Sequence, residues 1–203
     1  VIVDVTPSAR SFVKIVNFSS VKLPTDNRNL AYRAAELFLD RTMKQASVTI
    51  TLKKHIPVAG GLAGGSSDAA ATLRALNRAF KKPVTDKYLL SLAAELGSDV
   101  PYCLLGGTAL CEGRGELITR IPTAVSLHCV IVALDEHVST PVAYSALDEK
   151  YSNFKLPRND YSGEAFEDLI QALKNRSMPD GELFNIFESV VEEEIKEISS
   201  IKE

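Results

Sequence analysis

The sequence of 203 residues has few cysteines, no excess of positive charge and no long hydrophobic run. Its three cysteines, Cys103, Cys111 and Cys129, lack the CxxC or Cys/His spacing of zinc ligands, which favours free thiols in a reducing cytosol over disulfides or zinc. The net charge of -3 argues against a nonspecific nucleic-acid surface, because such binding relies on clustered Lys and Arg. We therefore expect small molecules, and no nucleic acid, as partners.

The apolar runs are of strand length and are interrupted by charge or glycine. None approaches the roughly 20 residues of a membrane-spanning helix. No basic segment followed by an apolar one opens the chain, which argues against a signal peptide. With 45% hydrophobic residues, the chain can bury a core for one domain or two small ones. We predict a cytoplasmic globular protein without a membrane partner, as a monomer or a homodimer.

Hydrophobic periodicity predicts strands and helices in alternation. Strands are predicted at 1–3 and 11–16, in SVTITLKK with Val48, Ile50 and Leu52 pointing inward, and in HCVIVAL as a buried strand. A hairpin is predicted for GGTALCEGRGELITRI, with Gly113 and Gly115 flanking its turn. The composition changes near residues 150–160, which marks a weak domain boundary. Helices are predicted around Leu30–Phe38, at 66–80, from Thr85 to Gly97, from Thr140-Pro141, at 164–175 and at 182–200.

A glycine-rich loop precedes the second of these helices. The segment KKHIPVAGGLAGGSSDAAA contains Gly60, Gly61, Gly64 and Gly65. A helix start offers unpaired N–H groups and partial positive charge, and glycines let these amides approach phosphate oxygens. Ser66 and Ser67 would add hydroxyl donors. The alternative is that the glycines only allow a strand and a helix to pack closely, with the serines as a cap.

Two better-known phosphate motifs do not fit this loop. The dinucleotide pattern G-x-G-x-x-G needs a glycine where Leu62 stands, and the P-loop needs a lysine where Ser66 stands. A second feature is Asp99 in LGSDVPYCLLGG, between Gly97 and Pro101. A carboxylate near bound phosphates can accept the proton of an alcohol in phosphoryl transfer, but the same aspartate could simply cap the next turn.

Two motifs carry a resemblance to a known family. IPVAGGLAGGSSDAAATLRALN resembles the ATP loop of the GHMP kinases, which include galactokinase and the homoserine, mevalonate and phosphomevalonate kinases. Together with GSDVPYCLLGGTALCEGRGE, it resembles the branch that phosphorylates 4-diphosphocytidyl-2-C-methyl-D-erythritol on its 2-hydroxyl in the non-mevalonate route to isoprenoids. The likeness continues in DNRNLAYRAAELF, in VSTPVAYSAL and more faintly in FNIFESVV.

The resemblance implies an α+β fold of the GHMP kinase type. Its N-terminal half would be of the left-handed-crossover, ribosomal-protein-like type, and its C-terminal half α/β. Residues 1–150 would form the ATP-binding domain without its first strands, and residues 151–203 the start of the C-terminal domain. ATP and Mg²⁺ are the cofactors that it implies.

The resemblance also assigns site residues. Asp99 would be the catalytic base, Asn29 would lie near the adenine, and Thr140 and Tyr144 near the cytidine, with Tyr144 as an aromatic shelf. The alternatives of a helix-start role for Asn29, a cap for Thr140 and core packing for Tyr144 stay open. The ATP phosphate loop would comprise Pro57, Val58, Ala59, Gly60, Gly61, Leu62, Ala63, Gly64, Gly65, Ser66 and Ser67.

Parts of the family pattern are missing from this sequence. The family carries a catalytic lysine in an AKIN-like segment, a Tyr-His pair that grips the cytosine and a GSGP-like loop, and we expect the chain to be truncated at both ends. Lys53 and Lys54 are expected to stay solvated at the end of their strand. Three rivals remain: a GHMP kinase with another acceptor, a diphosphate decarboxylase, and a noncatalytic nucleotide-binding module.

Overall fold

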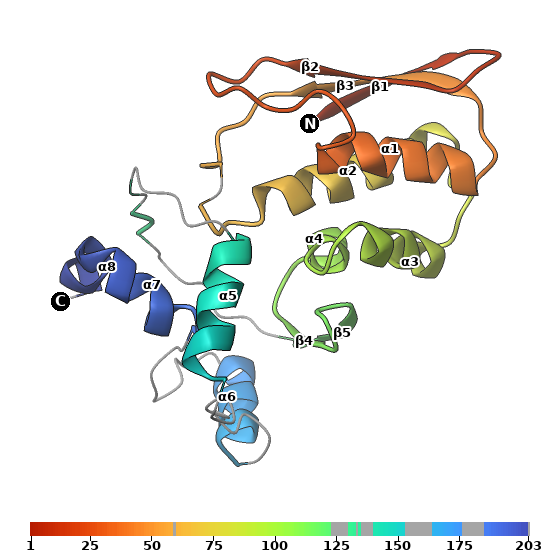
Figure 1. Ribbon diagram of the computed structural model, residues 1–203. Coiled ribbons are helices and arrows are strands. Elements are labelled where there is room, and N and C mark those ends of the chain that lie inside the picture. The colour runs from red at the N-terminus through yellow and green to blue at the C-terminus, as the bar shows by residue number, and fades with distance from the viewer. Residues whose placement is uncertain are drawn as a thin grey trace. The chain divides into compact units, whose positions relative to one another are not determined.

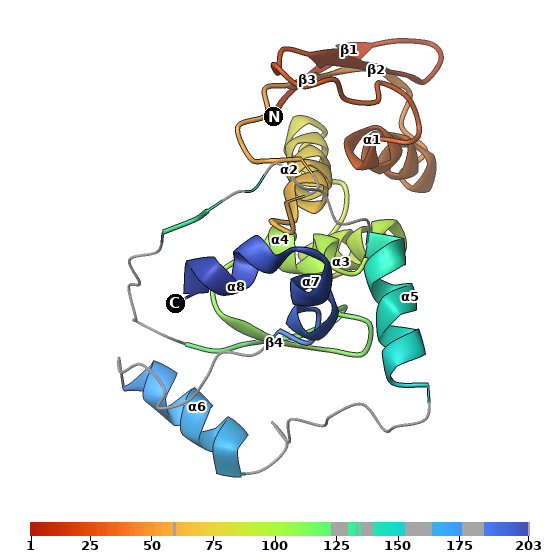
Figure 2. The same cartoon turned by 60° about the vertical axis from the view of Figure 1, so that its left-hand side comes forward.

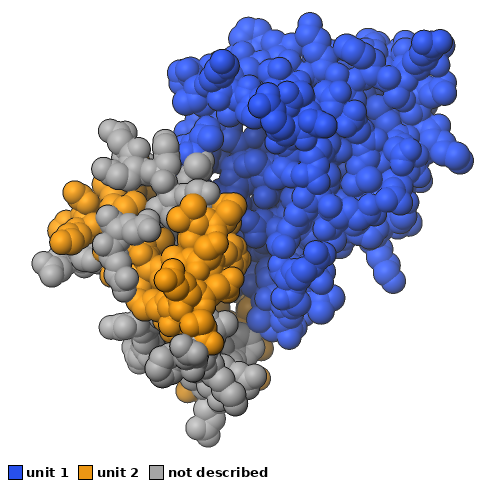
Figure 3. Space-filling model, viewed as in Figure 1, with its two compact units in different colours: residues 1–120 blue, residues 121–203 orange. Residues whose placement is uncertain are grey.

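The computed structural model describes residues 1–58, 60–122, 130–132, 134, 140–152, 164–175 and 185–202. The chain divides into two compact units, residues 1–120 and residues 121–203, drawn in blue and orange in Figure 3. Helices and strands are mixed along the chain, in agreement with the α+β class expected from the sequence. The domain limits expected from the sequence, 1–150 and 151–203, stay a prediction.

A three-stranded sheet forms one layer of the first unit. Strands β1 (Ile2–Pro7), β2 (Phe12–Asn17) and β3 (Ala46–Leu52) lie in the order β1-β3-β2, with β1 antiparallel and β2 parallel to β3. The predicted alternation holds, because Val48, Ile50 and Leu52 are all buried. Since β2 and β3 are parallel, the chain between them must cross over, and it does so through helix α1 (Leu30–Arg41).

Helices α1 and α2 (Gly64–Ala79) form the second layer, beneath one face of the sheet in both Figure 1 and Figure 2. Alanines on their facing sides, such as Ala34 and Ala70, are buried and allow the helices to approach closely. At the far ends of the helices, the Phe38 and Phe80 rings stack with centroids 6.1 Å apart. Both helices begin on the same side of the unit, where Leu30 lies next to Gly65.

Helices α3 (Asp86–Leu96) and α4 (Val100–Leu105) form a third layer, on the side of α1 and α2 away from the sheet. The Thr85 hydroxyl accepts a hydrogen bond from the Tyr88 N–H at 3.2 Å and Gly97 ends α3, as predicted. The predicted hairpin follows as β4 (Ala109–Glu112) and β5 (Leu117–Arg120). Gly113 and Gly115 have φ values of 70° and 111° at its turn, a conformation that favours glycine.

The second unit contains α5 (Thr140–Lys150), α6 (Glu164–Lys174), α7 (Glu188–Glu194) and α8 (Lys196–Lys202). The prediction of one helix over 182–200 is wrong, because Ile195 leaves the helical conformation (φ -119°, ψ 88°) between α7 and α8. The sequence places three consecutive glutamates, 192–194, at the C-terminal end of α7, where the helix dipole disfavours negative charge.

The predicted buried strand HCVIVAL is also wrong in its described part. Val130, Ile131 and Val132 are 91%, 68% and 56% exposed and do not lie in a strand. His128, Cys129 and Ala133 lie outside the described residues. The apolar pattern alone therefore did not produce a strand here. The sheets of the described residues contain β1 to β5, and none of these strands pairs with residues 130–132. Among the helices of the described residues, none has the length and apolar character to cross a membrane.

We expect Phe38→Ala to lower the free energy of unfolding by about 3–5 kcal/mol, because it removes a fully buried ring that stacks on Phe80. Met43→Ala serves as the control, because Met43 is 89% exposed and should change stability by less than about 0.5 kcal/mol. Urea unfolding followed by circular dichroism measures both. Equal losses in the two variants would contradict the assignment of the core.

Candidate active site

The glycine bend, which we define as residues 57–67, joins β3 to α2. Ala59 lies outside the described residues. Gly61 and Ala63 have left-handed φ values of 68° and 48°, and Ala63 is the residue immediately before α2. Gly60 packs closely on Pro57, because a Cβ at Gly60 would lie 3.2 Å from the Pro57 Cβ, which is tighter than ordinary contact. The bend thus reverses the chain sharply from the sheet into α2.

Three consecutive amides at the start of α2 have no hydrogen-bond acceptor within the described residues: those of Gly64, Gly65 and Ser66. Ala63 offers no side-chain cap, and the first N–H to be paired is that of Ser67, which donates to the Ala63 carbonyl at 2.9 Å. Unpaired amides and the helix dipole together favour an anion at such a helix start. The Ser67 hydroxyl donates back to the Gly64 carbonyl at 2.9 Å, within the helix.

The Lys54 side chain contacts this helix start. Its ammonium donates to the Gly64 carbonyl and to the Asp68 carboxylate, and its side chain is only 8% exposed. The expectation that both Lys53 and Lys54 are solvated is therefore wrong for Lys54, whereas Lys53 is exposed. The signal was present in the sequence: Lys54 continues the inward alternation of Ile50 and Leu52 by one more step, so it faces the buried side.

Asn29 stands at the start of α1. Its side-chain oxygen accepts from the Ala31 N–H at 3.0 Å, and its amide nitrogen donates to the Pro24 carbonyl at 2.8 Å. The structure thus gives Asn29 a capping role, the alternative considered for it. It does lie on the side of the unit where α2 also begins, because Leu30 is the neighbour of Gly65.

Asp99 immediately precedes α4 and is exposed. Its side chain makes no capping hydrogen bond, so the structure does not support the alternative of a cap. Helix α4 packs against α2, and the Arg74 guanidinium of α2 donates to the Leu104 carbonyl of α4. Burial, and then the nearby charge of Asp99, raise the pKa of the Cys103 thiol. Cys103 and Cys111 are free thiols, and Cys129 lies outside the described residues.

Thr140 and Tyr144 belong to the second unit. Thr140 is the first residue of α5 and is exposed. Tyr144 is 55% exposed, which argues against the alternative of core packing. Its ring packs against the Phe187 ring in a T-shaped arrangement, with centroids 5.0 Å apart and planes at 90°. Phe187 belongs to the FNIFESVV segment, and no role was predicted for this residue from the sequence.

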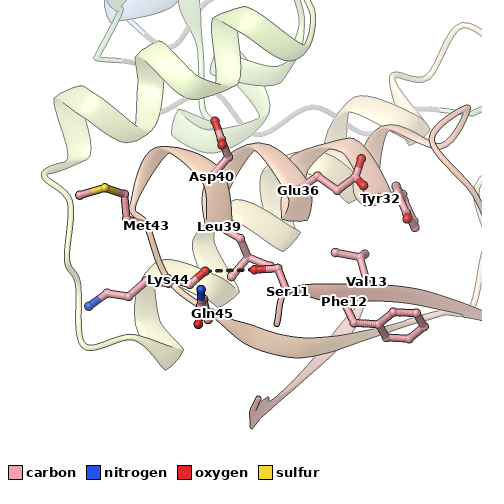
Figure 4. Close-up of a pocket in the computed structure, with 10 residues that line it drawn as sticks. All are labelled: Ser11, Phe12, Val13, Tyr32, Glu36, Leu39, Asp40, Met43, Lys44 and Gln45. Carbon is pink, nitrogen blue, oxygen red and sulfur yellow. Dashed lines mark hydrogen bonds between the residues drawn. The ribbon is translucent and has the colours of Figure 1, made fainter. Parts of the chain in front are cut away.

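Two hollows on the surface of the first unit lie away from the glycine bend. One of about 490 Å³ lies between the start of β2 and the C-terminal half of α1, and Figure 4 shows its lining, with the Ser11 hydroxyl bonded to the Lys44 carbonyl at 3.3 Å. Neither this hollow nor a smaller one between α1 and α3 includes a residue of the glycine bend. Within the described residues, no group of three or more His, Cys, Asp or Glu side chains could hold a metal ion.

Comparison with known proteins shows the family of the chain. Residues 29–107 match the family model of the GHMP kinases N terminal domain. A relative from Macrococcus caseolyticus, named 4-diphosphocytidyl-2-C-methyl-D-erythritol kinase, is 46% identical over 159 residues, which cover 76% of this chain and 56% of the relative. The chain belongs to the GHMP kinase family. The matched region of this GHMP kinase chain contains Asn29, the glycine bend and Asp99, whereas Thr140 and Tyr144 lie beyond it.

Further relatives agree with this membership. A protein of the same name from Clostridium acetobutylicum is 40% identical over 183 residues, 89% of this chain and 62% of the relative. A solved structure of a 4-(cytidine 5'-diphospho)-2C-methyl-D-erythritol kinase is 30% identical with a TM-score of 0.64, covering 98% of this chain and 66% of that one. The homoserine kinase from Cytophaga hutchinsonii, 21% identical with a TM-score of 0.69 over 86% of this chain and 59% of its own, shares the fold. The chain spans 56% and 62% of the length of these two curated relatives.

The two glycines that open α2 should respond differently to alanine. A Cβ at Gly65 would make an ordinary 3.6 Å contact with Leu30, so Gly65→Ala should raise the free energy of unfolding by about 0.5–1 kcal/mol through helix propensity. A Cβ at Gly64 would lie 3.0 Å from the Lys54 ammonium, so Gly64→Ala should lower it by about 1 kcal/mol or more by disturbing that hydrogen bond. Urea unfolding measures both changes, and a stabilising Gly64→Ala would contradict the packing described for Lys54.

Proposed function

We propose that this chain is the nucleotide-binding part of a cytoplasmic kinase that transfers the γ-phosphate of ATP to the 2-hydroxyl of 4-diphosphocytidyl-2-C-methyl-D-erythritol, a step of non-mevalonate isoprenoid precursor biosynthesis. The observation that carries the proposal is the row of three unpaired amides, Gly64, Gly65 and Ser66, at the start of a 16-residue helix. The names of the relatives support the choice of substrate.

The glycine bend binds the triphosphate in this proposal. The amides at the start of α2 donate to phosphate oxygens, and the helix dipole adds attraction for negative charge. The same donors stabilise the charge of the phosphoryl group during transfer, because they are already oriented before the reaction. Ala63 offers no side-chain donor, and the Ser67 hydroxyl is bonded to the Gly64 carbonyl, which leaves the Ser66 hydroxyl as the serine donor in this proposal.

Asp99 acts as the general base. Its carboxylate is exposed, and it has no hydrogen-bond or ion-pair partner among the described residues. It accepts the proton of the 2-hydroxyl while the hydroxyl oxygen bonds to the γ-phosphorus. The bond from that phosphorus to the oxygen bridging it to the β-phosphate breaks, and ADP leaves. Helix α4, which Asp99 precedes, packs on α2, and the proposal requires the Asp99 carboxylate to lie near the bend.

Mg²⁺ would neutralise part of the phosphate charge when bound. Such an ion usually keeps several waters and takes only one or two protein carboxylates together with substrate phosphates. The described residues hold no larger cluster of ligands, and Asp68 is already paired with Lys54. We assign no protein ligand to the metal. Asn29 is proposed near the adenine, and Thr140 and Tyr144 near the cytidine.

Asp99→Asn should lower kcat by roughly 10²- to 10⁴-fold and leave the affinity for ATP nearly unchanged, because it removes the proton acceptor and keeps the shape. Asp86→Asn is the matched control, since Asp86 is also an exposed aspartate at a helix start. Coupled measurement of ADP release gives kcat, and calorimetric titration gives the ATP affinity. An Asp99→Asn enzyme that turns over at the parental rate would remove Asp99 from the mechanism.

Tyr144→Ala should raise KM for the cytidylyl substrate about tenfold, because stacking of a base on an aromatic ring contributes about 1–3 kcal/mol. Tyr144→Phe should retain the parental KM, since the ring is kept. Val142→Ala, at another exposed position of α5, is the control. Initial rates over a range of substrate concentrations measure these values. A parental KM for Tyr144→Ala would exclude the shelf.

The acceptor is tested directly with a panel of alcohols. This chain, and a chain extended to the length of its relatives, are incubated with ATP and each alcohol, and ADP and phosphorylated product are quantified. Phosphorylation of the cytidylyl methylerythritol supports the proposal. Preference for another alcohol would show that the proposed acceptor is wrong and that this alcohol takes its place. Release of carbon dioxide would indicate a diphosphate decarboxylase. ATP binding without turnover in both chains would indicate a nucleotide-binding module.

A further inference from the structure

We propose that Lys54 is a positioning residue: with Asp68 it holds the first turn of α2 in the orientation that aims the three unpaired amides, and it is not itself a ligand of the phosphates. This inference deepens the proposed nucleotide site and rests on it. Lys54 was expected in solvent, and its role follows from where the structure places it.

The Lys54 side chain links the end of the sheet to the start of the helix. At its own backbone, the Lys54 N–H donates to the Ser19 hydroxyl at 2.7 Å, and just before it the Leu52 carbonyl accepts from the Phe18 N–H at 2.8 Å. At the other end, its ammonium donates to the Gly64 carbonyl and to Asp68. Both acceptors belong to the first five residues of α2, so a shift of this turn breaks both bonds.

Gly64 provides the space for this link. A Cβ at Gly64 would lie 3.0 Å from the Lys54 Nζ and 3.1 Å from its Cε, which is tighter than ordinary contact. A Cβ at Gly65 meets only Leu30, at 3.6 Å. Because Gly64 has no side chain, the Lys54 side chain can lie against its backbone. The same absence leaves space for a ligand that approaches the amides of the first turn.

The charges favour a positioning role over direct phosphate binding. The side chains of Lys54 and Asp68 are 8% and 16% exposed, and each neutralises the other. An ammonium that moved to a phosphate would leave the Asp68 carboxylate buried without its counter-ion, which is costly. The positive potential at the bend then comes from the helix amides. The bend needs no lysine at the position of Ser66, the residue that excludes the P-loop motif.

A double-mutant cycle tests the proposal in the full-length protein. Lys54→Met, Asp68→Leu and the combination of both are compared with the parent for two quantities, the midpoint of urea unfolding and the Kd for ATP by calorimetry. Lys53→Met is the matched control, because Lys53 is adjacent, of the same type and exposed. The combined variant replaces a buried ion pair by apolar side chains, which generally preserves stability. It therefore stays informative if a single variant does not fold.

A positioning role predicts a specific pattern. Each folded single variant binds ATP about 10- to 100-fold more weakly, because misplaced donors lose most of their effect. The combined variant recovers the unfolding midpoint but not the ATP affinity, and Lys53→Met matches the parent in both. If the combined variant recovers both quantities, the pair only packs the helix and the proposal is overturned. If Asp68→Leu binds ATP as tightly as the parent or more tightly, the ammonium is a phosphate ligand, which also overturns it.

The parent protein separates this inference from the function on which it rests. A parent that binds no ATP overturns the nucleotide site itself, and the positioning role with it. A parent that binds ATP, together with a Lys54→Met variant of unchanged affinity, overturns only the role of Lys54.

Discussion

Backbone N–H groups at the start of a helix have no partner inside the helix, and the candidate site depends on three of them, those of Gly64, Gly65 and Ser66. Most helix starts satisfy these groups with a side-chain cap, as Thr85 does for α3 and Asn29 for α1. Helix α2 begins instead after Ala63, which has no capping group. In contrast to α1 and α3, helix α2 thus leaves its first amides available for an external acceptor.

The buried face of the sheet determines where this helix start lies. Val48 and Ile50 of β3 are fully buried on the face of the sheet that the helices cover, so β3 cannot rotate about its axis without exposing them. The chain leaves β3 at Leu52 and reaches α2 twelve residues later. Lys54 connects the two ends of that segment with its side chain. In the proposal made for Lys54, the apolar core thereby determines the position of the first turn of α2, through the hydrogen bonds that the Lys54 ammonium donates.

Much of the first unit could be predicted from its sequence because the relevant signals are local. Alternation in β3, the Thr85 cap and the glycine turn of the hairpin each depend on residues that are close together in the chain. The capping role of Asn29 was foreseen as an alternative for the same reason. The ion pair of Lys54 and Asp68 was missed because it joins residues 14 apart across a bend whose path the sequence does not specify. Val130–Val132 and the break at Ile195 show the opposite limit: there, a local pattern did not determine the structure.

The two adjacent lysines that follow β3 differ in the side of the chain from which their side chains project. Lys53 leaves on the exposed side and Lys54 on the buried side, because the pleat alternates at every residue. A one-codon insertion between Val48 and Lys53 would exchange their sides and place the Lys53 ammonium under α2 instead of that of Lys54. In this stretch, a change in the number of residues therefore displaces Lys54 from α2 even when no residue is replaced.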